Sequence, residues 1–157
     1  MSQSPTSRRR PDRTSLESTR VRAEGADAIG TPHVFQAAFQ RDSARVAEMR
    51  RATALLLQRA GLPKRLAGDV VLAVSELVTN AVVHGEGDVK LWVRVIDGEV
   101  RVSVTDKNPS PAVLKDPDSD RESGRGLHLV AALADAWESL GEETWCEFRF
   151  GTGRGAA

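Results

Sequence analysis

The sequence contains a single cysteine, Cys146, which excludes an internal disulfide framework and a cysteine-based metal site. Neither sign of charge is in excess, because 22 Lys and Arg residues balance 22 Asp and Glu residues. No overall field therefore draws the chain to nucleic acid or to an anionic membrane. No apolar run is long enough to span a bilayer, and the N-terminus lacks the apolar core of a signal peptide. We therefore expect a cytoplasmic protein.

Several motifs that carry common chemistry are also missing. The sequence has no Gly-x-x-x-x-Gly-Lys-[Ser/Thr] phosphate-binding loop and no catalytic-loop motif of the protein kinases. His33 and His128 have no acidic or cysteine neighbours at ligand spacing, so the sequence predicts no zinc site.

What is present fits one domain with a sizeable core and two tails, since the chain has 157 residues of which 40% are hydrophobic. Residues 1–30 are rich in Ser, Arg, Thr and Gly and poor in large apolar residues. Such a segment buries too little surface to offset its ordering entropy, so we expect a disordered tail. The folded domain should span residues 31–150, and residues 151–157 should form a flexible C-terminus.

Periodicity and turn residues divide the domain into alternating elements. The sequence predicts strands at 33–40, 88–96, 99–106, 137–140 and 144–150, and helices at 44–59, 64–84 and 127–136. Residues 107–123 form a long segment with three prolines, as functional lids often do. This order predicts an α+β fold, in which helices cover one face of an antiparallel or mixed sheet.

The stretch VVLAVSELVTNAVVHG, residues 70–85, is the centre of the longest predicted helix. Glu76 and Asn80 lie four residues apart within it and are therefore neighbours on one helix surface. A carboxylate and a carboxamide among valines and leucines are costly unless a polar group meets them. Taken alone, the pair is better explained by a helix with a polar stripe that faces solvent.

Two further polar interruptions follow along the chain. Asp106 continues the alternation of Val100, Val102 and Val104, so its side chain should point to the same inward face of the strand. A carboxylate on that face requires a hydrogen-bond donor from the protein or from a ligand. Residues Gly124-Arg125-Gly126 directly precede the predicted helix at 127–136. Glycines at a helix N-terminus let backbone N–H groups approach an anion, which the helix dipole also favours.

In this order and on these elements, the three interruptions resemble the nucleotide site of the GHKL ATPase superfamily, whose ATP-binding fold is also called the Bergerat fold. The closest resemblance is to the small anti-sigma-factor serine/threonine kinases of bacteria. The similarity covers residues 33–150 and includes Glu76-Leu77-Val78-Thr79-Asn80-Ala81, the following His84-Gly85, and Gly124-Arg125-Gly126-Leu127.

The resemblance implies a role for each matching residue. Asn80 would supply an oxygen to Mg²⁺ bound to the phosphates of ATP, and Asp106 would accept the exocyclic amine of adenine. Gly124 and Gly126 would form the turn that cradles phosphate, with Arg125 in the lid and Leu127 opening the helix behind it. Glu76 would be the general base toward the γ-phosphorus.

The resemblance also implies partners, namely a sigma factor that is kept from RNA polymerase and a small anti-anti-sigma protein that is phosphorylated. Members of the family commonly form homodimers, and no direct contact with nucleic acid or membrane is expected. One departure leaves an alternative open, because the glycine box that normally follows the adenine-binding aspartate is replaced by Lys107-Asn108-Pro109-Ser110-Pro111. The alternative is a nucleotide-gated or nucleotide-free module that sequesters a regulator without phosphotransfer.

Overall fold

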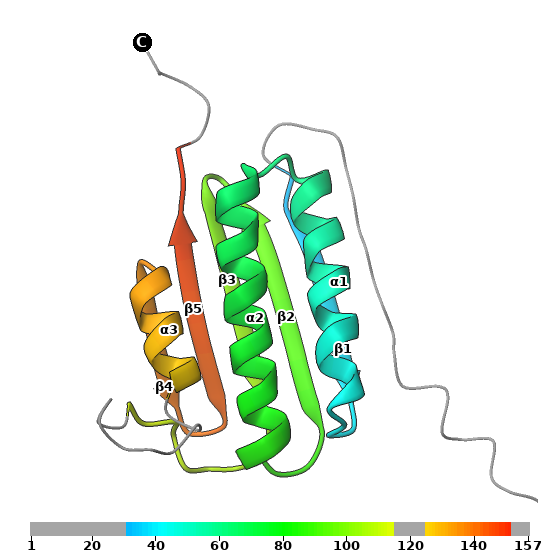
Figure 1. Cartoon of the computed structure of the whole chain (residues 1–157), viewed down its shortest axis with the longest axis vertical. Helices are drawn as coiled ribbons and strands as arrows, with labels where there is room; N and C mark the ends of the chain where they lie inside the picture. Colours follow the sequence, from blue (N-terminus) through cyan, green and yellow to red (C-terminus); the bar gives the residue numbers. More distant parts are fainter. Residues whose placement is uncertain (1–30, 115–124, 152–157) are drawn as a thin grey trace, which may run out of the picture.

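A computed structural model describes residues 31–114 and 125–151 of the chain (Figure 1). The predicted tail at 1–30, residues 152–157 of the predicted tail at 151–157, residues 115–123 of the predicted lid, and Gly124 lie outside the described residues. The elements are β1 (His33–Phe39), α1 (Ala44–Arg59), α2 (Lys64–His84), β2 (Val89–Ile96), β3 (Glu99–Thr105), α3 (Arg125–Leu133), β4 (Ala136–Leu140) and β5 (Glu143–Arg149).

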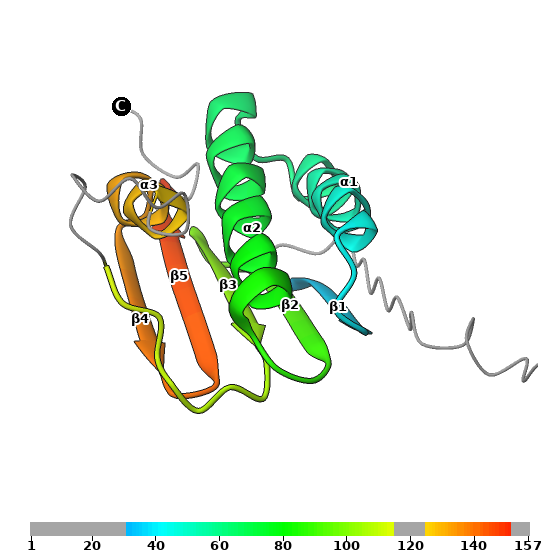
Figure 2. The ribbon, with the colours of Figure 1, turned by 60° about the horizontal axis from the view of Figure 1, so that its bottom comes forward.

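The strands form one five-stranded sheet in the order β1-β2-β3-β5-β4, and every neighbouring pair is antiparallel. All three helices lie on the same face of this sheet, with α2 between α1 and α3 (Figure 2). The predicted α+β fold with helices on one face is therefore confirmed, and of the two predicted sheet types the antiparallel one is found.

Alternation of apolar and polar residues explains how the strands divide between the two faces of the sheet. In β2 the residues Val89, Leu91, Val93 and Val95 are buried under the helices, and their neighbours point to the other face. The β2–β3 turn is Asp97-Gly98, where both residues have positive φ (45° and 79°), as a tight hairpin turn requires.

Helix α2 supplies the centre of the core. Its buried residues follow helical spacing and face the sheet and the neighbouring helices: Val70, Ala73, Val74, Leu77, Val78 and Ala81. By length and composition alone α2 would suffice to cross a membrane, with a mean hydropathy of 1.6, contrary to the expectation that no segment would. The core position accounts for this hydropathy, since each fully buried Val or Leu side chain contributes about 1.5–3 kcal/mol to folding.

The last helix differs from its predicted bounds of 127–136. Helix α3 begins at Arg125, so Arg125 and Gly126 belong to its first turn instead of preceding the helix. It ends at Leu133 because the chain then joins the sheet: the backbone N–H of Asp135 donates to the Glu147 carbonyl at 2.9 Å, and Ala136 opens β4.

Candidate functional site

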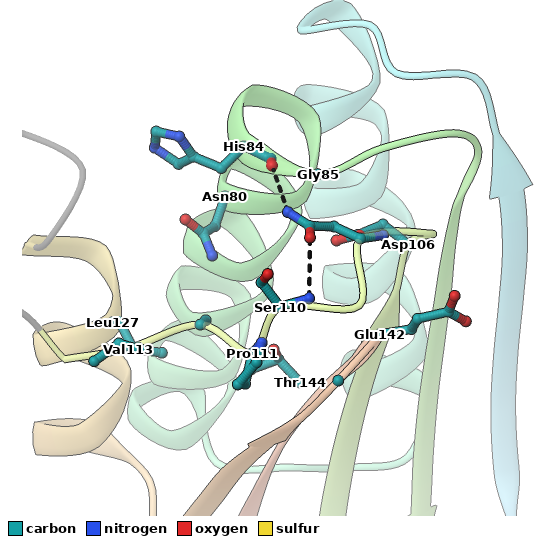
Figure 3. A pocket seen from close by; sticks show the side chains of 13 residues that line it. Asn80, His84, Gly85, Asp106, Ser110, Pro111, Val113, Leu127, Glu142 and Thr144 are labelled. Atoms are coloured by element: carbon teal, nitrogen blue, oxygen red, sulfur yellow. Dashed lines mark hydrogen bonds between the residues drawn. The ribbon is translucent and has the colours of Figure 1, made fainter.

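A cavity of about 270 Å³ lies where the C-terminal end of α2 meets the end of β3 (Figure 3). Asn80, His84 and Gly85 line it from α2 and its C-cap, and Asp106 lines it from the end of β3. The rest of the wall comes from the loop after β3, from Leu127 of α3 and from the β4–β5 turn.

Asp106 is half-buried and is fixed by two backbone contacts. Its N–H donates to the Glu142 carbonyl at 3.0 Å, and its Oδ1 accepts the N–H of Asn108 at 2.6 Å. A carboxylate offers about four acceptor positions. The Asp106 carboxylate therefore retains acceptor capacity toward a ligand.

Gly85 makes room for this carboxylate. A Cβ added at Gly85 would stand 2.7 Å from Asp106 Oδ2 and would also collide with the carbonyl of Ala81. Its φ of −75° is accessible to any residue, so the requirement for glycine is one of space and not of backbone strain.

Residues 107–114, which follow β3, contain no glycine, and side chains hold this part of the loop in place. Asn108 Nδ2 donates to the His84 carbonyl at 3.2 Å, and Asn108 Oδ1 accepts the N–H of Ser110 at 3.0 Å (Figure 3). Further along, Ser139 Oγ accepts the N–H of Ala112 at 2.8 Å and contacts Thr144 Oγ1 at 2.8 Å. The loop is thus bound to both α2 and β4.

The sequence analysis missed Asn108, which lines the cavity, and Ser139, which does not line it but holds the loop. A signal for Asn108 was available, since Asn side chains hydrogen-bond to the backbone two residues on and Asn108 precedes Pro109. Ser139 lies in β4, the strand at one edge of the sheet. The sequence predicted a strand there, but no local pattern links this residue to the loop after β3.

Asn80 and His84 lie one helical turn apart on the surface of α2 that faces the cavity. Asn80 is half-buried, whereas His84 is exposed at the helix end. The structure therefore brings Asn80, Asp106 and Leu127, which were predicted from separate elements, to one cavity.

Glu76 lies one turn before Asn80 and does not line the cavity. Its side chain contacts α3 instead. Glu76 Oε2 lies so close to Gly126 that a Cβ added at Gly126 would collide with it. Arg125 is exposed in the first turn of α3, away from the cavity wall. Of the predicted site residues that the structure describes, three thus line the cavity, Glu76 and Gly126 meet where α2 contacts α3, and Arg125 belongs to neither group.

The two acids of the β4–β5 hairpin point in different directions. Glu142 is exposed at the turn, and its carboxylate points away from Asn80 and His84 (Figure 3). Glu143 accepts a hydrogen bond from Ser103 Oγ at 2.6 Å on the face of the sheet opposite the helices. Neither carboxylate faces the cavity interior.

No group of three or more His, Cys, Asp or Glu side chains among the described residues could hold a metal ion. Mg²⁺ bound by a protein commonly keeps several waters and takes one or two protein oxygens together with phosphates. The carboxamide of Asn80 fits that donor set, provided that a nucleotide supplies the other oxygens.

Comparison with known proteins agrees with this geometry. A profile of the histidine kinase-like ATPase domain matches residues 39–150. The anti-sigma F factors of two Clostridium botulinum strains, Eklund 17B and Alaska E43, are 36% identical to this chain over an alignment of 81 residues, and the match covers 43% of this chain. The chain spans 56% of the length of these relatives. The resemblance inferred from the sequence is confirmed: the chain belongs to the histidine kinase-like ATPase family.

Proposed function

We propose that this chain binds Mg²⁺-ATP in the cavity between α2 and β3 and acts as an anti-sigma factor with serine/threonine kinase activity. The observation that carries the proposal is that Asn80 and Asp106 line one cavity, although 25 residues and two strands separate them. Membership of the ATPase family and the similarity to anti-sigma F factors support the same assignment.

Asp106 forms the adenine end of this site. Its carboxylate has unused acceptor positions and would accept a hydrogen bond from the exocyclic amine of adenine, which guanine lacks at the equivalent position. Gly85 keeps the space beside the carboxylate clear, and Leu127 provides buried apolar surface on the opposite wall.

Asn80 and the N-terminal turn of α3 form the phosphate end. Asn80 would hold Mg²⁺ jointly with phosphate oxygens, and the ion supplies charge neutralisation at the transferring phosphoryl group. Gly124, Arg125 and Gly126 precede or open α3, where free N–H groups and the helix dipole favour an anion.

Glu76 would accept the proton of the attacking serine or threonine hydroxyl. The hydroxyl oxygen would bond to the γ-phosphorus while the bond from that phosphorus to the β–γ bridging oxygen breaks. The added phosphate would then weaken the binding of the phosphorylated partner through its charge.

One observation favours a second candidate function: Glu76 contacts α3 and does not line the cavity. That candidate is a nucleotide-gated module that sequesters a regulator without phosphotransfer.

Calorimetric titration with ATP tests the site itself. We expect Mg²⁺-dependent binding that Asp106→Asn weakens at least about ten-fold, since the amide adds an N–H beside the donor it should meet. Asp97→Asn is the matched control, because it makes the same change at the turn before β3, where Asn also tolerates positive φ. Equal binding by wild type and Asp106→Asn would refute the adenine assignment.

Transfer of radiolabel from γ-labelled ATP to a purified anti-anti-sigma protein separates the two candidates. A kinase should lose transfer in Glu76→Gln by about 10²–10⁴-fold while retaining ATP affinity. Glu48→Gln on the exposed surface of α1 should have no effect. ATP binding without any transfer in the wild-type protein would favour the sequestering module.

A further inference from the structure

Residues 106–112 present no free backbone N–H group to the cavity, although most of them line it. The N–H groups of the five residues other than proline all donate to acceptors of the protein, at 2.6–3.0 Å. Pro109 and Pro111 have no N–H group. The charged group that this segment places on the cavity wall is the carboxylate of Asp106. This wall is therefore suited to a ligand group that donates hydrogen bonds.

The orientation of the Asp106 carboxylate is set from two sides. Its Oδ1 accepts the N–H of Asn108 at 2.6 Å. Its Oδ2 lies beside the α-carbon of Gly85, where an added Cβ would stand 2.7 Å away. Gly85 gives the carboxylate space, and the N–H of Asn108 fixes its rotation.

The side chain of Asn108 in turn holds that N–H in place. Its Nδ2 donates to the carbonyl of His84 at 3.2 Å, and its Oδ1 accepts the N–H of Ser110 at 3.0 Å (Figure 3). His84 is the last residue of α2, and the last carbonyls of a helix have no partner within the helix. One carboxamide thus ties the donor for Asp106 to the end of the helix that carries Asn80.

We propose that Asn108 is a positioning residue that determines which purine the site accepts. By holding the Asp106 carboxylate in one orientation, Asn108 favours a purine with an amino group at position 6 over a purine with an oxo group there. The amino group donates to the carboxylate, whereas the oxo group would bring a second acceptor against it. The segment 106–112 has no free backbone donor to offer the oxo group instead.

Preorganisation is the physical basis of this role. A carboxylate that is already held in its binding orientation loses little freedom when the ligand arrives, so more of the hydrogen-bond energy contributes to affinity. A carboxylate that is free to turn can move away from an oxo group, which lowers the cost of binding the wrong base. Loss of Asn108 should therefore weaken discrimination as well as affinity.

This inference rests on the proposed function, because it takes the ligand to be a purine nucleotide bound through Asp106. Calorimetric titrations of the full chain with Mg²⁺-ATP and with Mg²⁺-ITP test it through the ratio of the two Kd values. ITP differs from ATP only in the base, where an oxo group replaces the amino group at position 6. The wild-type protein should prefer ATP at least about ten-fold.

Asn108→Ala should reduce this preference by about 3–10-fold, since the carboxylate is then free to turn. Asn108→Asp should reduce it too, because this variant keeps an acceptor for the Ser110 N–H but loses the donor to the His84 carbonyl. The ratio separates positioning from a purely structural role. In a variant that only loses stability, or of which a fraction is inactive, both nucleotides are affected equally and the ratio stays as in wild type.

Asn80→Ala is the matched control, because it makes the same substitution at the proposed phosphate end of the cavity. It should weaken the binding of both nucleotides and leave their ratio unchanged. A wild-type protein that does not bind ATP would refute the proposed function and this inference with it. Equal affinity of the wild type for ATP and ITP, or an unchanged ratio in Asn108→Ala, would overturn this inference alone and leave Mg²⁺-ATP binding standing.

Discussion

The carboxylate of Asp106 lies directly against the α-carbon of Gly85, so the end of β3 and the C-cap of α2 meet without a side chain between them. Glycine at position 85 is therefore required by this tertiary contact and by the Ala81 carbonyl of the preceding turn, even though its backbone conformation would suit any residue. The carboxylate can face the cavity only because the helix ends on a residue that has no Cβ.

Gly85→Ala should displace Asp106 and the loop that follows it. We expect a loss of about 1–3 kcal/mol in the free energy of unfolding, typical of overpacking, and weaker ATP binding in calorimetry. Gly68→Ala is the matched control, because nothing lies within 4 Å of a Cβ added at that position in α2. That change should stabilise the protein by about 0.5–1 kcal/mol through helix propensity. Equal melting temperatures for the two variants would contradict this account.

Asn108→Ala should loosen the loop that carries the cavity wall. The change removes a donor to the His84 carbonyl and an acceptor for the Ser110 N–H, each of which contributes about 0.5–1.5 kcal/mol. Asn108→Asp keeps the acceptor and loses the donor, so its denaturation midpoint should lie between those of wild type and Asn108→Ala. Hydrogen exchange of the Ser110 amide provides a local readout, and unchanged protection in Asn108→Ala would show that the side chain does not hold the loop.

Gly126→Ala should be coupled to Glu76. The added methyl group would collide with Glu76 Oε2, whereas the same methyl group raises helix propensity when Glu76 is shortened to alanine. A double-mutant cycle should therefore give an interaction energy of about 0.5–3 kcal/mol from chemical denaturation. Additive effects would show that the two residues do not share space, which would also remove the structural reason for Glu76 lying outside the cavity.

Cys146 should be unreactive in the folded protein. Burial in the core raises the pKa of its thiol from 9.0 to about 12, so the thiolate that reacts with alkylating reagents is scarce at mildly alkaline pH. Iodoacetamide should label the native protein far more slowly than the unfolded chain. Rapid labelling of the native state would place Cys146 near solvent.

The same shift in pKa gives a direction for alkaline stability. The unfolded chain releases the thiol proton at its ordinary pKa, whereas the folded chain retains it, so unfolding is favoured as the pH rises from 9.0 toward about 12. Below that range this contribution is constant. Cys146→Ala should be less stable below pH 9.0 but should show a shallower alkaline decline, and the absence of tyrosine leaves this range free of phenol titration.

The sequence alone determined the helices α1 and α2, whose observed bounds match the predicted ones, because their apolar spacing and end signals are local. It also determined the family, since Glu76, Asn80, Asp106 and the glycines before Leu127 stand in a recognisable order. The roles of these residues remain predictions. The alternation of side chains along the strand was sufficient to predict that Asp106 points to the helix side of the sheet, where it lines the cavity.

Only the tertiary structure decided which of those residues share the cavity and which do not. The contact between Glu76 and Gly126 depends on how α2 and α3 pack, and the hydrogen bond from Asn108 to His84 joins residues 24 positions apart. The alignment of Lys90 with Glu143 across β3 likewise follows from strand register and sheet order. Local patterns contain no information about these distances, because packing and strand pairing are set by the whole chain at once.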